Sequence, residues 1–188
     1  EITTKKNNNK KIKILFLTVN LENQGGNWTR KKRDFMLKEF FKFCSSDDYI
    51  CSIKIHPTSE NLDEYKKIMA SVDSKIPIFQ KQDLVDCLKD VDVVISMSSS
   101  TAGLISLILK KPMIIWNYFN VKNDLFLDNK VVLECKNIEK LSDYVKYVLE
   151  VNPATKEKLQ SVMSNVLYKT DGKASERIAD EILKLIKK

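Results

Sequence analysis

The sequence contains only one histidine, His56, and only four glycines among its 188 residues. One histidine and four widely spaced cysteines do not make a plausible zinc set, so we expect no metal site and four reduced thiols. The loop after the first expected strand holds Gly25-Gly26 but no GxGxxG or Walker A pattern, so it gives no support to dinucleotide or ATP sites of those kinds. No apolar run reaches the length of a membrane span.

Basic residues outnumber acidic ones by 32 to 25, which gives a net charge of +7. Part of the excess lies in residues 1–11, which we expect to be a disordered basic leader, and smaller clusters lie at 30–33 and 184–188. Aromatic residues do not alternate with these charges as they do in single-strand binders, so we expect no nucleic-acid partner. We expect a cytoplasmic protein with a solvated basic surface, and peripheral contact with anionic headgroups at the inner membrane face is a weaker alternative.

Apolar runs alternate with helical patterns along most of the chain, which predicts an α/β fold. We expect a Rossmann-like, doubly wound parallel sheet of about six strands in the order 3-2-1-4-5-6, with helices on both faces and extra C-terminal helices. Residues 12–188 are expected to form a single domain, and Glu1 in place of an initiating Met indicates part of a longer chain. The expected strands are 12–19, 49–55, 76–79, 91–97, 113–116 and 131–134. The expected helices are 30–43, 62–72, 84–89, 104–110, 138–151, 154–168 and 173–186.

Four hydroxyl residues, Ser98 to Thr101, lie between an expected buried strand and the helix that follows. Unpaired N–H groups and the helix dipole make such a turn a candidate anion site. The same residues are equally typical of a Ser/Thr N-cap followed by Gly103 as a tight packing glycine. Both interpretations remain open on this segment alone.

His56-Pro57 follows the expected strand 49–55, and Thr58 or Ser59 is expected to cap the next helix. A lone histidine is more often structural than catalytic. However, ligands of open α/β sheets bind beyond the carboxyl ends of the strands, where His56 and Ser98 to Thr101 would meet. An imidazole there can donate a hydrogen bond to a phosphate oxygen, or carry a positive charge beside it.

Two further connections leave the same expected edge of the sheet. Phe79 and Gln80 end the short third strand, where backbone groups could meet a nucleobase above an aromatic ring; Phe79 itself fits the core at least as well. The segment 117–128, with Asp124 near its end, is the longest polar connection on this edge and is expected to be an exposed loop.

The motifs and their order resemble those of a known family. These are Ile53-Lys54-Ile55-His56-Pro57, Asp92-Val93-Val94-Ile95-Ser96, Ser98-Ser99-Ser100-Thr101-Ala102-Gly103, Lys111-Pro112-Met113-Ile114-Ile115 and Asp171-Gly172-Lys173-Ala174-Ser175-Glu176-Arg177. From Lys11 onward the chain is similar to the C-terminal, donor-binding half of a GT-B glycosyltransferase, in the group of CDP-glycerol glycerophosphotransferases and capsule polysaccharide transferases.

This resemblance implies a nucleotide-activated donor, either a nucleotide sugar or CDP-glycerol, as substrate, with no cofactor. It implies that Ser99, Ser100 and Thr101 hold the diphosphate and that His56 lies against it as the candidate catalytic residue; Ser98 and Gly103 complete the expected site. The acceptor site would belong to an N-terminal half absent from this chain, so the chain alone is expected to be inactive in cell-surface polysaccharide synthesis. A UDP-GlcNAc 2-epimerase-like enzyme and a non-catalytic flavodoxin-like binding or signalling module are the alternatives.

Overall fold

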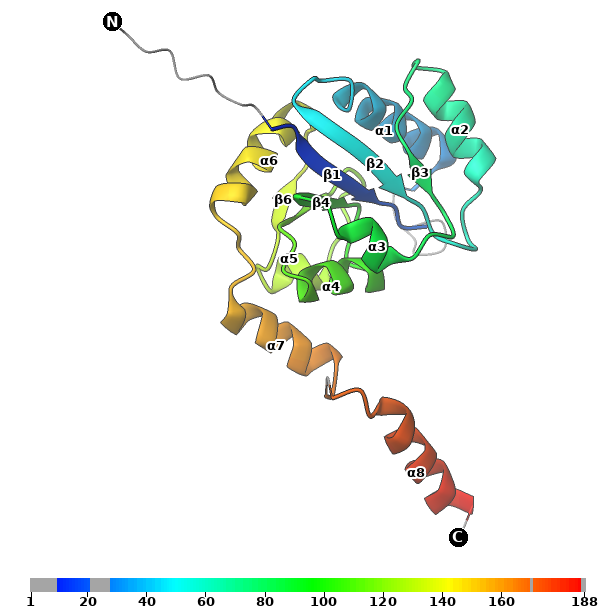
Figure 1. Ribbon diagram of the computed structural model, residues 1–188, viewed down its shortest axis with the longest axis vertical. Helices are drawn as coiled ribbons and strands as arrows, with labels where there is room; N and C mark the ends of the chain where they lie inside the picture. Colours follow the sequence, from blue (N-terminus) through cyan, green and yellow to red (C-terminus); the bar gives the residue numbers. More distant parts are fainter. Residues whose placement is uncertain (1–9, 21–27, 170, 187–188) are drawn as a thin grey trace, which may run out of the picture.

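The computed structural model describes residues 10–20, 28–169 and 171–186, and within them the chain forms one parallel sheet (Figure 1). Its strand order is β3-β2-β1-β4-β5-β6, as the sequence predicts. The expected leader, apart from Lys10 and Lys11, and the Gly25-Gly26 loop lie outside the described residues. The strands are β1 (Ile12–Leu17), β2 (Tyr49–Lys54), β3 (Ile78–Phe79), β4 (Val93–Ser96), β5 (Met113–Trp116) and β6 (Leu133–Cys135).

The described helices connect these strands in the alternation that a doubly wound sheet requires. The helix that follows β1 begins and ends at the predicted residues, and the others differ from prediction by a few residues at their ends. They are α1 (Arg30–Phe43), α2 (Leu62–Ala70), α3 (Leu84–Leu88), α4 (Thr101–Ile108), α5 (Leu125–Asp128), the 3-10 turn η1 (Ile138–Lys140), α6 (Leu141–Glu150), α7 (Lys156–Val166) and α8 (Ala174–Ile186).

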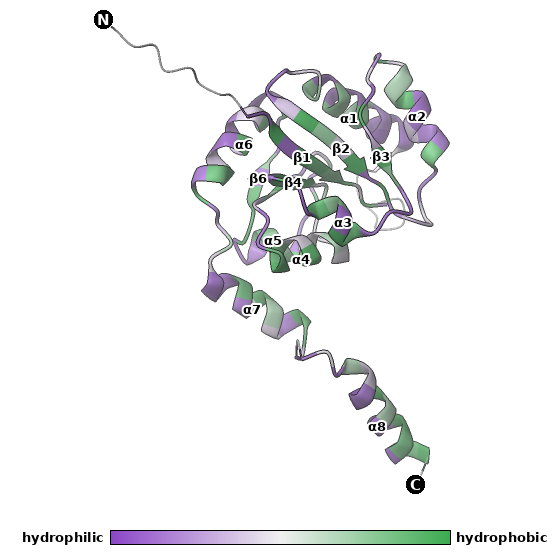
Figure 2. Ribbon diagram, in the orientation of Figure 1, coloured by the Kyte–Doolittle hydropathy of each residue, from purple (hydrophilic) through white to green (hydrophobic). Residues whose placement is uncertain are grey.

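The central strands are buried on both faces, which explains their continuous apolar sequences. Every residue of β4 and β5 is buried. Helices α1, α2 and α6 cover one face through one cluster of buried side chains, and α3, α4, α5 and α7 cover the other through a second cluster (Figure 2). The sheet is therefore held from both sides, and its carboxyl edge is left to loops.

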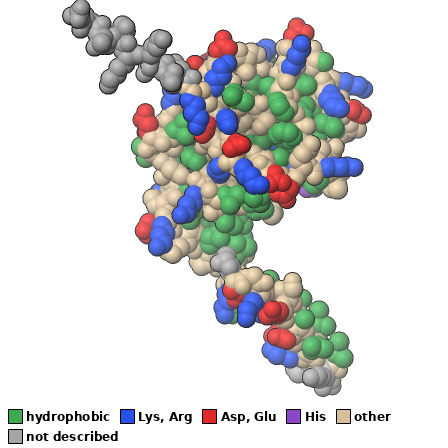
Figure 3. All heavy atoms as spheres, in the orientation of Figure 1, with side chains coloured by type: hydrophobic (Ala, Val, Ile, Leu, Met, Phe, Trp, Pro, Cys, Tyr) green, Lys and Arg blue, Asp and Glu red, His purple; other side chains and the backbone are tan. Residues whose placement is uncertain are grey.

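Helix α8 differs from the others because none of its residues is buried. It lies beyond α7 at the C-terminal end of the chain, and apolar side chains are visible along it (Figure 3). In the part of the chain that the structure describes, no helix is both long and apolar enough to cross a membrane.

The prediction of an exposed loop at 117–128 is wrong in one respect, because Asn117, Phe119, Asp124 and Phe126 are buried and the end of the segment forms α5. Asn117, which is 3% exposed, accepts a hydrogen bond from the Val121 N–H at 2.7 Å and donates one to Glu134 Oε1 at 2.7 Å. The loop backbone and β6 thus satisfy the Asn117 side chain, so its polarity does not indicate exposure.

Candidate functional site

A cavity of about 790 Å³ opens at the carboxyl edge of the sheet, over the ends of β1, β2, β3 and β4. The chain reverses its winding between β1 and β4, which is the point where open α/β sheets bind their ligands. Segments 17–20, 54–57, 80–84 and 99–102 supply most of the lining. The structure thus brings His56, Gln80, Ser99, Ser100 and Thr101 to one cavity.

The turn after β4 is both an N-cap and a source of free donors. Ser100 is the N-cap of α4, and its Oγ accepts a hydrogen bond from the Gly103 N–H at 3.1 Å. Among the described residues, the N–H groups of Thr101 and Ala102 have no hydrogen-bond partner, and both residues line the cavity. The two interpretations of this segment therefore coexist: Ser100 caps the helix and the next two N–H groups remain available to an anion.

A carboxylate already holds the Ser99 N–H of the same turn, whereas the Ser100 N–H has no hydrogen-bond partner among the described residues. The Ser99 N–H donates to Asp124 Oδ2 at 2.6 Å, while Asp124 Oδ1 caps α5 by accepting from the N–H groups of Phe126 and Leu127. Asp124 is 3% exposed and does not line the cavity. The Ser99 N–H is therefore engaged, and the N–H groups left for an anion are those of the residues after it, Thr101 and Ala102 among them.

Two expected site residues, Ser98 and Gly103, lie behind the cavity rather than in its lining. Ser98 is buried, and its carbonyl accepts a hydrogen bond from Ser96 Oγ at 2.8 Å. Gly103 is buried where α4 meets Phe126 and Met113. Both residues support the turn from inside.

Gly103→Ala is expected to lower the free energy of unfolding by about 1 kcal/mol. An added Cβ would lie 2.8 Å from Phe126 Cε2 and 2.9 Å from Met113 Cε. The methionine methyl can move, but the buried phenyl ring cannot, and such overpacking costs about 1–3 kcal/mol. The greater helix propensity of alanine returns up to about 1 kcal/mol. Chemical denaturation measures the difference, and a variant more stable than the wild type would contradict this packing role.

His56 is exposed at the end of β2, and its imidazole ring is held by the following turn. Nδ1 accepts hydrogen bonds from the N–H groups of Ser59, at 3.1 Å, and Thr58, at 3.3 Å. Because Nδ1 is an acceptor, the neutral ring carries its hydrogen on Nε2. Neither Thr58 nor Ser59 caps α2 as expected; Asn61 does, by accepting from two N–H groups of the first turn.

The loop after β3 is largely engaged with its neighbours. Phe79 is half-buried against the second core cluster and does not line the cavity, whereas Gln80 does. The Gln80 N–H donates to Gln82 Oε1 at 2.9 Å, and its Nε2 donates to the Glu60 carbonyl at 2.8 Å. The backbone of Gln80 therefore already has partners, and the expectation that Phe79 packs beneath a ligand ring finds no support in its placement.

Lys54, the last residue of β2, is a cavity-lining cation that the sequence analysis did not single out. It is only 9% exposed, and its Nζ donates to the carbonyls of Gln80, at 2.6 Å, and Ile55, at 3.3 Å. Within the described segments, no carboxylate lies within ion-pair distance of it. Buried charges are normally paired, so an anion in the cavity would complete this site. The described residues contain no cluster of three or more metal-ligating side chains.

Comparison with solved structures shows the same fold. S. aureus MnaA in a UDP co-structure matches with a TM-score of 0.51 and 16% identity over 94% of this chain and 47% of its own. The catalytic domain of a Helicobacter pylori cholesterol-α-glucosyltransferase matches with a TM-score of 0.52 and 15% identity, over 84% of this chain and 100% of its own. Spinosyn rhamnosyltransferase SpnG, complexed with spinosyn aglycone, matches with a TM-score of 0.54 and 11% identity, over 82% of this chain and 41% of its own. The chain thus spans about half the length of MnaA. At these identities the likeness establishes a GT-B glycosyltransferase-like fold.

Comparison of sequences is more specific. No curated protein matches the chain. Residues 22–184, however, match the family model described as CDP-Glycerol:Poly(glycerophosphate) glycerophosphotransferase, which covers most of the 188 residues and every cavity-lining segment from β2 onward. This match agrees with the fold and with the resemblance of the ordered motifs. The chain therefore belongs to the CDP-glycerol:poly(glycerophosphate) glycerophosphotransferase family of transferases.

Proposed function

We propose that the cavity binds the diphosphate of a nucleotide-activated donor, CDP-glycerol or a nucleotide sugar, for group transfer. One observation carries this proposal: His56, the buried cation Lys54, and Thr101 and Ala102 with their unpaired N–H groups all line the same cavity. Lys54 and His56 lie at the end of β2, and Thr101 and Ala102 follow β4. The donors therefore come from both sides of the point between β1 and β4 where the chain reverses its winding. Together they are the chemistry that recognises a phosphate chain.

The proposed role of the site in the reaction is to stabilise the leaving nucleotide. As the bond to the transferred group breaks, negative charge gathers on the diphosphate oxygens. The helix N–H groups are fixed in advance and need no reorganisation to meet that charge. His56 Nε2–H would donate to the same oxygens, and Lys54 would supply a full positive charge.

The wider context extends the same proposal. The family description names poly(glycerophosphate) as the acceptor of the transferred group, which supports a role in extending a polymer of the cell surface. The UDP in the MnaA structure supports a nucleotide as the common ligand of this fold. We propose that acceptor-binding residues lie in a second domain, because the chain spans 47% of MnaA and 41% of SpnG. The four cysteines are free thiols, as suits a cytoplasmic enzyme.

Replacing His56 tests which ring nitrogen binds the donor. A hydrogen bond to a charged group contributes about 1.5–3 kcal/mol, so His56→Ala is expected to weaken CDP binding about 10- to 100-fold in calorimetric titration. His56→Asn keeps an acceptor near the Nδ1 position, and His56→Gln places an amide N–H near the Nε2 position. We expect Asn to behave like Ala and Gln to retain part of the affinity. Equal affinity in all four proteins would remove His56 from the proposed site.

A further inference from the structure

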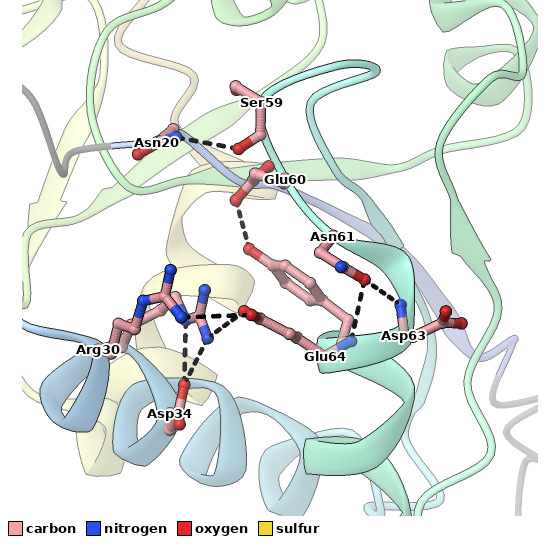
Figure 4. A network of polar contacts seen from close by, with 10 residues as sticks. Asn20, Arg30, Asp34, Ser59, Glu60, Asn61, Asp63 and Glu64 are labelled. Carbon is pink, nitrogen blue, oxygen red and sulfur yellow. Dashed lines mark hydrogen bonds and ion pairs between the residues drawn. The ribbon is translucent and has the colours of Figure 1, made fainter.

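Glu60, which Figure 4 shows between Ser59 and Asn61, connects four parts of the structure around the base of the cavity. Its Oε2 accepts hydrogen bonds from the His56 N–H at 2.6 Å and from Thr18 Oγ1, and its Oε1 accepts from the Tyr65 hydroxyl. Its backbone carbonyl accepts from Gln80 Nε2 at 2.8 Å. The partners therefore come from the loops after β1, β2 and β3 and from α2.

The contacts between His56 and Glu60 close the turn from both ends. The side chain of His56 accepts from the N–H groups of Thr58 and Ser59, just before Glu60, and the side chain of Glu60 accepts from the His56 N–H. The same reciprocal arrangement occurs in a capping box, where each of two side chains accepts a hydrogen bond from a backbone N–H at or near the other residue. Neither the backbone of His56 nor its ring can turn without breaking at least one of these bonds.

The carboxylate of Glu60 is in turn held by buried partners. Tyr65 is 1% exposed, and its burial, reinforced by the charge of Glu60, raises the pKa of the phenol. The phenol therefore keeps its proton and remains a donor to Glu60. Thr18 is 8% exposed and fixes the other oxygen. Glu60 itself does not line the main cavity, so its effect on a ligand there must pass through other residues.

We propose that Glu60 is a positioning residue that fixes the His56 imidazole as its Nε2–H tautomer at the cavity. This role rests on the proposed function, because it is the donor diphosphate that would use the Nε2–H. Glu60 acts on the backbone of His56 and on the turn that supplies the Nδ1 hydrogen bonds, rather than on the ring directly. Its bond to Gln80 joins the same turn to the loop after β3.

Glu60→Gln tests this role through the only histidine in the chain. The amide is similar in size but replaces one acceptor oxygen with a donor group, so it cannot accept from Tyr65 on one side and from His56 and Thr18 on the other, as the carboxylate does. Long-range ¹H–¹⁵N spectra of the imidazole report the tautomer directly. We expect the wild type to show the Nε2–H tautomer, and Glu60→Gln to show a mixture of tautomers and to bind CDP about tenfold more weakly.

Glu64→Gln is the matched control, because it removes a nearby carboxylate that serves a different partner. Glu64 Oε2 accepts from Arg33 at 2.8 Å, a bond that lowers the pKa of the Glu64 carboxyl, and Glu64 lies outside the main cavity. We expect this variant to keep the wild-type tautomer and CDP affinity. Tyr65→Phe removes only one donor to Glu60, and we expect a smaller shift of the tautomer in the same direction as Glu60→Gln.

The outcomes separate this proposal from the proposed function. A folded Glu60→Gln variant with the wild-type tautomer overturns the positioning role, as does an altered tautomer with unchanged CDP affinity. If Glu60→Gln does not fold, the proposal is tested with Tyr65→Phe instead, and an unchanged His56 spectrum in that variant overturns it. If the wild type does not bind CDP, the proposed function fails, while the spectra still establish whether Glu60 controls the ring.

Discussion

Thr101→Asp is expected to abolish the binding of CDP and UDP while leaving the protein folded. Thr101 is exposed at the first position of α4, and its own N–H is one of the unpaired donors at the start of that helix, in the cavity lining. A carboxylate there would meet the diphosphate at close range, and two like charges about 4 Å apart repel by about 4 kcal/mol at an effective dielectric constant of about 20. The affinity measured by calorimetry should therefore fall at least about 100-fold.

The same carboxylate should not harm the fold. An acidic side chain at a helix N-terminus stabilises the helix by about 0.3–1 kcal/mol. Thr101→Asn is the matched control, since it has nearly the same shape without the charge, and we expect it to bind CDP within a few-fold of the wild type. Similar losses in the Asp and Asn variants would mean that shape rather than charge decides, and that the diphosphate lies elsewhere.

Lys54→Met is expected to weaken CDP binding about 10- to 100-fold, the range for losing a hydrogen bond to a charged group. Methionine fills a similar volume but removes the cation that we propose the diphosphate neutralises. The variant also leaves the carbonyls of Gln80 and Ile55 without a donor, which costs stability of about 1–3 kcal/mol. Affinity must therefore be measured well below the midpoint of thermal unfolding.

Lys81→Met provides a comparison at the same cavity. Lys81 lines it as well but is exposed, and solvent-exposed charges contribute about 0–1 kcal/mol. We expect less than about a fivefold loss of CDP affinity, and a stronger dependence on salt for the part that Lys81 contributes. Equal losses for the two lysines would show that general positive charge, and not the buried position of Lys54, attracts the nucleotide.

The sheet order and the bounds of α1 could be predicted because long apolar patterns report burial on both faces. The ends of the strands could not be predicted, because a residue can be buried without pairing to a neighbouring strand. Val91 and Met97 are 9% and 2% exposed, yet β4 includes only Val93–Ser96. The pattern therefore gave too long a strand. In the same way, the buried polar residue Asn117 misled the prediction of an exposed loop, because its hydrogen bonds to the loop backbone and to Glu134 leave no trace in the sequence pattern.

Site residues that belong to a short sequence motif could be predicted. Residues whose role depends on hydrogen bonds to distant parts of the chain were missed. His56 before a proline and hydroxyls before a helix are recognisable at a strand end. Asp124 reaches the Ser99 N–H across 25 residues, and Glu60 reaches Thr18 across 42. Lys54 looks like an ordinary polar residue in an alternating strand. Only the folded arrangement shows that it is buried and faces carbonyl oxygens.

The most direct test of the account is a titration of the ¹⁵N-labelled chain with CDP, followed by NMR at the backbone amides and at the single imidazole. We expect one saturable transition, with the largest shifts at the N–H groups of Thr101 and Ala102 and at Nε2 of His56, all fitting the same dissociation constant. Absence of saturable shifts at about millimolar CDP, which corresponds to a binding free energy of only about −4 kcal/mol, would contradict it. Shifts confined to residues outside the carboxyl edge of the sheet would contradict it equally.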